Sequence, residues 1–388
     1  MNFLLAILLL CSPQEHETKH YQLRAEGIDV EDTGRLLEEL HKQLKTFFGK
    51  APKGKLKVEV WSTEERWADS IRKDGAGVPT GAGGYYWPTS KKAYLYVQPS
   101  EHYTRQLILH EATHQFHYLA GTGNRSPGAF WYTEGLAEYF GMHTWDGKTL
   151  QTGVVPPITL EDYPKQALEN FDKLDKNLEG MVTGKVSCER PEAWGLIHYL
   201  ANKHTKRFKA FRKAVDRSRK PAAAWRRYFG KINSKFVSDY RNWILSHQQP
   251  WRIAWTSWQA VGEEIEGRSE TNGLCLLKEK PTKLVVQVDP TEETYLGGIV
   301  FGFQSTSDFY LFQVNSQNEA RVMRYQNRKW NTLHTASRPP PEKKDILSLS
   351  IEADTVTLHV NGQEIGTYDA PGEVGLNVDS CTIRFRVR

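Results

Sequence analysis

The 388-residue chain has few cysteines, few methionines and only one long apolar run. Its four cysteines form no CxxC pair and lack the spacing of a zinc ribbon, which excludes cysteine-based metal or redox chemistry. The net charge of +5 is too small to favour nucleic acid or an anionic membrane as a partner. The composition is 39% hydrophobic and 25% charged, and no internal repeat is present, which excludes collagen, coiled coils and wholesale disorder. A globular protein of about two to three domains is expected.

The apolar run extends from Phe3 to Cys11, which is too short to cross a bilayer core of about 30 Å. Its length is typical of a secretory signal, so residues 1–13 are interpreted as a signal peptide, and no transmembrane span is expected. The protein is then exported to the periplasm, the cell surface or the medium. Lipidation at Cys11 is an alternative. In an oxidising compartment Cys275 and Cys381 form either a disulfide or two buried thiols.

Residues 14–250 are predicted to form an α+β domain. Apolar residues recur at helical spacing over 32–48, alternate as in a strand over 55–61, and indicate two further strands near 85–88 and 93–97. Ser62 with Glu65 predicts a capping box, and Thr133 a second helix cap. Helices are expected over 100–120 and through most of 191–243.

Helical periodicity ends near Pro250, and short alternating segments fill residues 251–388. Asn361-Gly362, placed between two such segments, is a strong hairpin signal. We therefore predict an all-β sandwich of two antiparallel sheets as a separate C-terminal domain.

The sequence His110-Glu111-Ala112-Thr113-His114 lies inside one predicted helix. Four residues advance a helix by about one turn, so both imidazoles project from one face and can bind one metal ion. Glu134, on the next predicted helix, supplies a third ligand and leaves a position open for water. Glu138 shares its helical face and is expected to accept the outer N–H of a ligand histidine. His117 is expected to pack in the protein rather than bind the metal.

These segments resemble the gluzincin zinc metallopeptidases, among them thermolysin and the aminopeptidase N group. They are more similar still to a family of bacterial peptidase-MA-like proteins in which HEATHQ-like and WxxEGLAEY-like segments recur. The resemblance covers roughly residues 55–240 and is most specific between 107 and 139. It implies a gluzincin domain with one Zn²⁺ per chain, bound by His110, His114 and Glu134.

The same resemblance implies roles for three further parts of the chain. Glu111 acts as the general base that activates a water molecule. The segment with Gly84, Tyr85 and Tyr86 forms an edge strand that pairs with an extended peptide substrate, although its aromatic rings could instead belong to the core. A tyrosine commonly precedes the helix that begins here near Ala193. Arg190 stands at that place and is expected to stabilise the oxyanion, unless it only forms a salt bridge with Glu189 or Glu192. The alternative donors are Tyr199, His198, Tyr86 and His117.

From Trp258 onward the chain resembles the concanavalin-like jelly rolls of laminin-G-type and sugar-hydrolase-like domains. The residues that carry this resemblance are Gly297–Gly302, Val360–Gly362, Gly372–Leu376 and Ile383–Phe385. It implies a binding or spacer module whose ligand is a glycan or a protein. The basic stretch Lys203–Arg241 is interpreted as a solvated helical surface, with no nucleic acid partner.

Two functions follow from these observations. The first is an exported zinc metallopeptidase that hydrolyses peptide bonds. The second is a catalytically inactive zinc-binding surface protein whose C-terminal sandwich binds a glycan or a protein.

Overall fold

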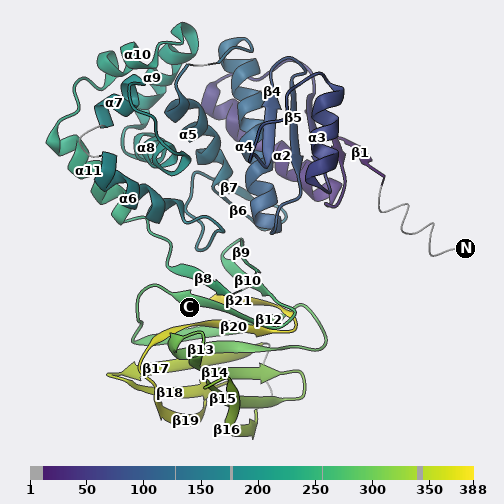
Figure 1. Cartoon of the computed structure of the whole chain (residues 1–388), viewed down its shortest axis with the longest axis vertical. Coiled ribbons are helices and arrows are strands. Elements are labelled where there is room, and N and C mark those ends of the chain that lie inside the picture. The colour runs from purple at the N-terminus through teal and green to yellow at the C-terminus, as the bar shows by residue number, and fades with distance from the viewer. Residues whose placement is uncertain (1–11, 127, 175–177, 256, 339–343) are drawn as a thin grey trace, which may run out of the picture. The chain divides into compact units, whose positions relative to one another are not determined.

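The computed structural model describes residues 12–126, 128–174, 178–255, 257–338 and 344–388. Two compact units divide the chain: residues up to Pro156 with Glu161–Gln248, and Pro157–Leu160 with Gln249–Arg388 (Figure 1). The predicted fold class, an α+β region followed by an antiparallel β-sandwich, is confirmed. Of the predicted signal segment, residues 1–11 lie outside the described part of the chain. Within the described part, no helix is both long and apolar enough to span a membrane.

The first unit is built on a five-stranded sheet with the strand order β1-β2-β3-β5-β4. The inner strands β2, β3 and β5 are parallel, and the outer strands β1 and β4 pair antiparallel with their neighbours. Strand β4 therefore lies at one edge of the sheet. The bounds are β1 Gln14–Glu17, β2 Tyr21–Ala25, β3 Leu56–Trp61, β4 Gly84–Trp87 and β5 Lys92–Tyr96.

Helices cover both faces of this sheet (Figure 1). Helices α2 (Val30–Phe48) and α4 (Glu101–Phe116) pack on one face, and α3 (Glu64–Lys73) packs on the other. The predicted capping box of Ser62 with Glu65 is not formed. Helix α3 begins at Glu64, so Thr63 is the N-cap and accepts from the Arg66 N–H, while the Ser62 hydroxyl donates to Glu26.

The rest of the first unit is mainly helical and packs onto α4 through α5. The sequence predicted Thr133 as the N-cap of α5, and this prediction is wrong, because the helix begins three residues earlier, at Phe130. The Thr133 hydroxyl donates to the Ala129 carbonyl, as in a helix interior. The remaining elements are η1 His117–Thr122, α5 Phe130–Gly141, β6 His143–Trp145, β7 Leu150–Thr152, α6 Tyr163–Leu174, α7 Leu178–Thr183, α8 Arg190–Lys203, α9 Thr205–Ser218, α10 Pro221–Tyr228 and α11 Ser234–Leu245.

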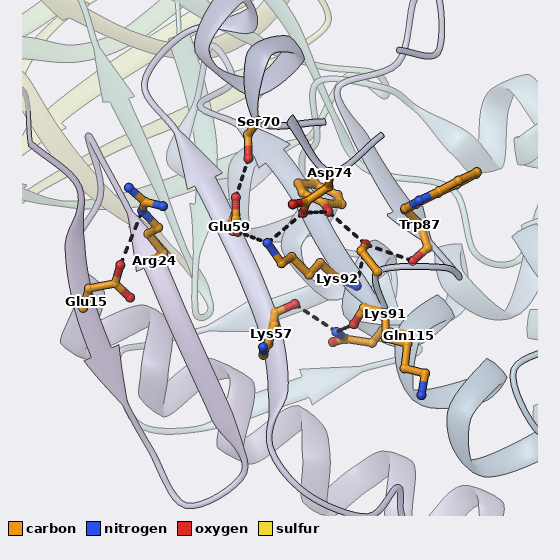
Figure 2. A network of polar contacts seen from close by, with 12 residues as sticks. Glu15, Arg24, Lys57, Glu59, Ser70, Asp74, Trp87, Lys91, Lys92 and Gln115 are labelled. Atoms are coloured by element: carbon orange, nitrogen blue, oxygen red, sulfur yellow. Dashed lines mark hydrogen bonds and ion pairs between the residues drawn. The ribbon is translucent and has the colours of Figure 1, made fainter. Parts of the chain in front are cut away.

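Gln115 ties α4 to the sheet at the end of the histidine motif. Its side chain is fully buried, and its amide donates to the backbone carbonyls of Lys57 at 2.9 Å and Lys91 at 2.8 Å (Figure 2). Nearby, the Lys92 ammonium lies between the carboxylates of Glu59 and Asp74, at 2.9 and 2.7 Å. The Gln115 contacts hold α4 over β3 and the turn before β5, whereas the Lys92 contacts join β5 to β3 and to the end of α3.

The second unit is a sandwich of two seven-stranded antiparallel sheets, ordered β19-β18-β17-β12-β21-β10-β9 and β16-β15-β14-β13-β20-β11-β8. The bounds are β8 Trp251–Trp255, β9 Ser257–Val261, β10 Glu264–Arg268, β11 Asn272–Leu277, β12 Lys283–Pro290, β13 Leu296–Ser305, β14 Asp308–Asn315, β15 Glu319–Gln326, β16 Lys329–Ser337, β17 Asp345–Glu352, β18 Thr355–Val360, β19 Gln363–Asp369, β20 Glu373–Asp379 and β21 Thr382–Val387.

The predicted hairpin is present, because β18 and β19 pair across Asn361 and Gly362, both at positive φ. In the sandwich, strands β8, β9, β10, β16 and β20 were not predicted from the sequence. The described cysteines Cys188, Cys275 and Cys381 are free thiols, so the alternative of two buried thiols describes Cys275 and Cys381.

Replacing Gln115 by leucine should lower the free energy of unfolding by about 2 kcal/mol, because two partly buried backbone carbonyls lose their donor. Urea denaturation measures this change. Gln151→Leu, at an exposed position of β7, is the control and should change stability by less than about 0.5 kcal/mol. Equal effects of the two substitutions would show that the Gln115 amide does not anchor α4.

Candidate metal centre

Helix α4 presents two histidines to one point. His110 and His114 are one helical turn apart, and their Nε2 atoms lie 3.0 Å from each other. Both residues are buried. The rings meet nearly at right angles, with an interplanar angle of 80°. This arrangement directs two imidazole nitrogens at a common space, as predicted from the motif.

Glu134 completes the group from α5. One of its carboxylate oxygens lies 3.4 Å from His110 Nε2, and the other lies 3.4 Å from His114 Nε2. Ligand atoms bound tetrahedrally to zinc at about 2.0–2.2 Å are separated by about 3.3 Å. The observed separations therefore fit three ligands of a single zinc-sized ion, and the three residues form a candidate metal site.

Glu138 lies behind His110, one turn after Glu134. Its Oε1 atom is 3.1 Å from His110 Nδ1, and both side chains are only 1% exposed. A carboxylate at Nδ1 holds the ring proton on this nitrogen, so that the unprotonated Nε2 atom faces the metal position. The predicted supporting role of Glu138 is thus compatible with its position.

The charges of this group favour a bound cation. Burial lowers the pKa of His110, but the carboxylates of Glu138 and Glu134 outweigh burial and raise it to about 10. Burial raises the pKa of Glu134, and the neighbouring His114 and His110 outweigh it, so that pKa is lowered. The carboxylates therefore remain charged and attract positive charge to the space between the imidazoles.

Gly135 sets the distance between α5 and α8. A Cβ atom at this position would lie 2.4 Å from the Ala193 carbonyl oxygen of α8, so only glycine permits the approach. Helix α8 begins at Arg190, and its close packing on α5 carries that residue to the carboxylates. The glycine that follows Glu134 in the sequence thus has a direct structural role.

Arg190 forms ion pairs with the carboxylates of α5. Its Nε atom lies 3.7 Å from an oxygen of Glu134 and 3.7 Å from an oxygen of Glu138. Burial lowers the pKa of Arg190, but the charges of Glu138 and Glu134 outweigh burial and raise it. The arginine side chain is 42% exposed. It is therefore beside the candidate metal site and open to solvent.

Glu111 is buried next to the metal ligands. Its carboxylate lies 4.0 Å from His110 Nε2, and burial raises its pKa. Gly84 of β4 provides the space for this side chain, because a Cβ atom there would lie 2.8 Å from Glu111 Cγ. The predicted base and the predicted edge strand are thus in contact.

The other predicted or alternative site residues have partners elsewhere. The Tyr86 hydroxyl donates to Asn124 at 2.7 Å, and the ring of Tyr85 lies 5.8 Å from that of Trp87. His117 is buried, with its Nε2 atom 2.9 Å from Asp216. It packs in the protein, as the sequence analysis expected.

Tyr118 was not singled out from the sequence. It lies in the π-helical turn η1 that continues α4, and its ring is 6.4 Å from that of His114 and 5.4 Å from that of Tyr86. π-Helical turns occur frequently at functional sites. Its position four residues after His114, on the same helical face, was the available signal.

Removal of one imidazole should abolish metal binding. His114→Ala leaves only two protein ligands, one fewer than a catalytic zinc site requires. We therefore expect less than a tenth of the wild-type zinc content after equilibration with Zn²⁺. Elemental analysis of folded protein gives the stoichiometry. The control His334→Ala changes a histidine of β16 and should retain one zinc per chain. Full zinc content in His114→Ala would contradict this ligand set.

Residues 106–223, which include the three candidate ligands, match a family described as "Protein of unknown function (DUF1570)". No curated protein matches the chain.

Among solved structures, a carbohydrate-binding module of family 66 from Bacillus subtilis is 18% identical, with a TM-score of 0.32, over 35% of this chain and 92% of that one. A protein of unknown function with a galectin-like fold, also from Bacillus subtilis, is 11% identical, with a TM-score of 0.28, over 35% and 86%. A β-glucanase from Bacillus licheniformis is 9% identical, with a TM-score of 0.28, over 35% and 89%.

Proposed function

We propose that this protein is an exported zinc-dependent peptidase. The observation that carries the proposal is the convergence of His110, His114 and Glu134, with a separate buried carboxylate, Glu111, 4.0 Å from one ligand nitrogen. A site that only binds zinc has no need of this additional carboxylate. Export is proposed from the apolar run near the N-terminus.

A zinc ion held by His110, His114 and Glu134 would supply a Lewis acid that polarises a peptide carbonyl and lowers the pKa of water to about 7. Glu111 accepts a proton from the attacking water and delivers it to the leaving amine nitrogen. The raised pKa of Glu111 suits both steps, because a base that must also act as an acid works best with a pKa near the working pH.

Strand β4 is proposed to bind the substrate backbone. It pairs with β5 along one side and is the last strand of its sheet, so an extended peptide can add to the other side. Gly84 brings this strand against Glu111, which places an added peptide near the base. Backbone hydrogen bonding of this kind does not require a particular peptide sequence.

Arg190 is proposed as the donor that stabilises the oxyanion. Its guanidinium reaches the carboxylate of Glu134, remains charged and is accessible to solvent. The alternative donors have partners elsewhere: the Tyr86 hydroxyl donates to Asn124, and His117 lies against Asp216. His198 accepts from the Trp243 indole, and the Tyr199 hydroxyl lies 3.2 Å from His204. Tyr118 is the competing donor that the structure adds.

Glu111→Gln should retain zinc and abolish hydrolysis, because a carboxamide cannot accept the proton. Digestion of an unfolded protein such as reduced casein, measured together with zinc content, provides the test. Glu101→Gln is the control, since this exposed glutamate begins the same helix. An inactive wild-type protein with full zinc content would instead support the alternative, a zinc-binding protein without catalysis.

Arg190→Ala should lower kcat by about 100- to 1000-fold, the effect of losing one oxyanion donor, while zinc content stays near one per chain. Arg190→Lys should retain part of the activity, because lysine keeps the positive charge but lacks the several N–H donors of the planar guanidinium. Tyr118→Phe, tested in parallel, should keep kcat within a few-fold of the wild type. The reverse pattern would assign the donor to Tyr118.

A further inference from the structure

The two sheets of the sandwich differ on the faces that point away from the inter-sheet core. The outward positions of β12, β17 and β18 are mainly polar, for example Gln287, Ser350 and Thr357. The opposite sheet carries a second apolar cluster on its outward positions: Leu274, Leu276, Val300, Phe303, Phe309 and Leu311. These side chains alternate along their strands with residues of the inter-sheet core, such as Cys275, Phe301 and Phe312.

A cavity of about 370 Å³ opens at this second cluster, lined by Trp255, Thr271, Asn272, Phe309, Tyr325 and Trp330. Its volume falls within the range of about 300–1,000 Å³ that is typical of small-ligand sites. Four of the six lining residues are aromatic, and none is charged. The cavity belongs entirely to the second unit and is separate from the candidate metal centre.

The aromatic rings form a continuous group across the sheet. The ring of Phe309 lies 6.0 Å from that of Trp255, 5.4 Å from that of Tyr325 and 5.7 Å from that of Trp330. Strand register fixes part of this group, because Phe309 pairs with Tyr325 and Tyr325 pairs with Trp330 on adjacent strands. The rings are therefore positioned by backbone pairing.

Trp330 leaves a large apolar surface in contact with water. It is 40% exposed, on strand β16 at the edge of its sheet. Exposed tryptophan next to an open cavity is typical of ligand-binding surfaces. Its indole stands 4.8 Å from the ring of Tyr325 and is presented at the mouth of the cavity.

The chemistry of the lining selects the class of ligand. The axial C–H groups of a pyranose are slightly positive and pack on the negative face of an aromatic ring. The amide of Asn272 and the hydroxyl of Thr271 can hydrogen-bond to sugar hydroxyls and orient the ring. Because no charged side chain lines the cavity, an anionic or cationic ligand would have no partner for its charge.

We propose that this aromatic cavity binds a neutral glycan, with Trp330 and Tyr325 as the stacking platform. The polar groups of Asn272 and Thr271 then contribute to selection among sugars. This site is independent of the proposed peptidase activity, because all of its residues lie in the other unit.

Affinity electrophoresis of the full-length protein in gels containing soluble neutral polysaccharides tests the proposal. Barley β-glucan, xylan, dextran and levan serve as probes, and polygalacturonate is the anionic comparison. We expect retardation by at least one neutral polysaccharide and none by polygalacturonate. Trp330→Ala should weaken the apparent affinity by at least tenfold.

Leu333→Ala is the matched control, because Leu333 is equally exposed on the same strand, at 46%, but does not line the cavity. It should bind like the wild type. Glu111→Gln should also bind like the wild type, and Trp330→Ala should still digest casein, which separates this proposal from the peptidase proposal.

Three results would overturn the glycan proposal. The first is the absence of retardation by all neutral probes with folded wild-type protein. The second is unchanged binding in Trp330→Ala. The third is a loss of casein binding caused by Trp330→Ala. It would be measured in the inactive Glu111→Gln protein, with and without the second substitution, and would assign the cavity to a protein ligand instead.

Discussion

The first unit depends on the balance of charge among buried groups between α4 and α5. Glu111, Glu134 and Glu138 bring three carboxylates to a space that two imidazoles and one guanidinium share. Isolated buried carboxylates are costly unless they are paired. Protonated His110 can supply part of the positive charge, and a divalent cation at the same point supplies it without a proton. The ligand geometry and the electrostatics therefore favour the same occupant.

The neighbouring structure maintains this balance through one close approach of two helices and one pair of hydrogen bonds. Gly135 allows α8 to approach α5, which brings Arg190 to Glu134 and Glu138. Gln115 holds α4 on the sheet, immediately after the second ligand. A glycine and a glutamine, neither of which touches the metal position, thus determine how accurately the ligands meet.

Local patterns in the sequence predicted most of this site. Helical spacing placed His110 and His114 on one face, because that relation lies within a single element. The partners of Arg190 could not be predicted, since they depend on the packing of α8 against α5. The alternative salt bridge considered from the sequence was with Glu189 or Glu192, whereas the observed partners are Glu134 and Glu138. The predicted caps at Ser62 and Thr133 were wrong because the sequence does not fix where each helix begins: α3 begins one residue later and is capped by Thr63, and α5 begins after Ala129, which has no capping side chain.

In the sandwich, the residues of the proposed ligand site could not be found from periodicity. Strand β16 was missed because nearly all of its residues are exposed, so no alternation of apolar and polar residues marks it. Yet this strand carries Trp330, the most exposed ring of the aromatic cavity. A strand whose side chains are not needed for the core can present them to a ligand. Because such a strand does not have to alternate apolar and polar residues, its sequence carries no periodic signal. In the metal centre, by contrast, His110, Glu111 and His114 are buried inside one regular helix, where their spacing in the sequence reveals them.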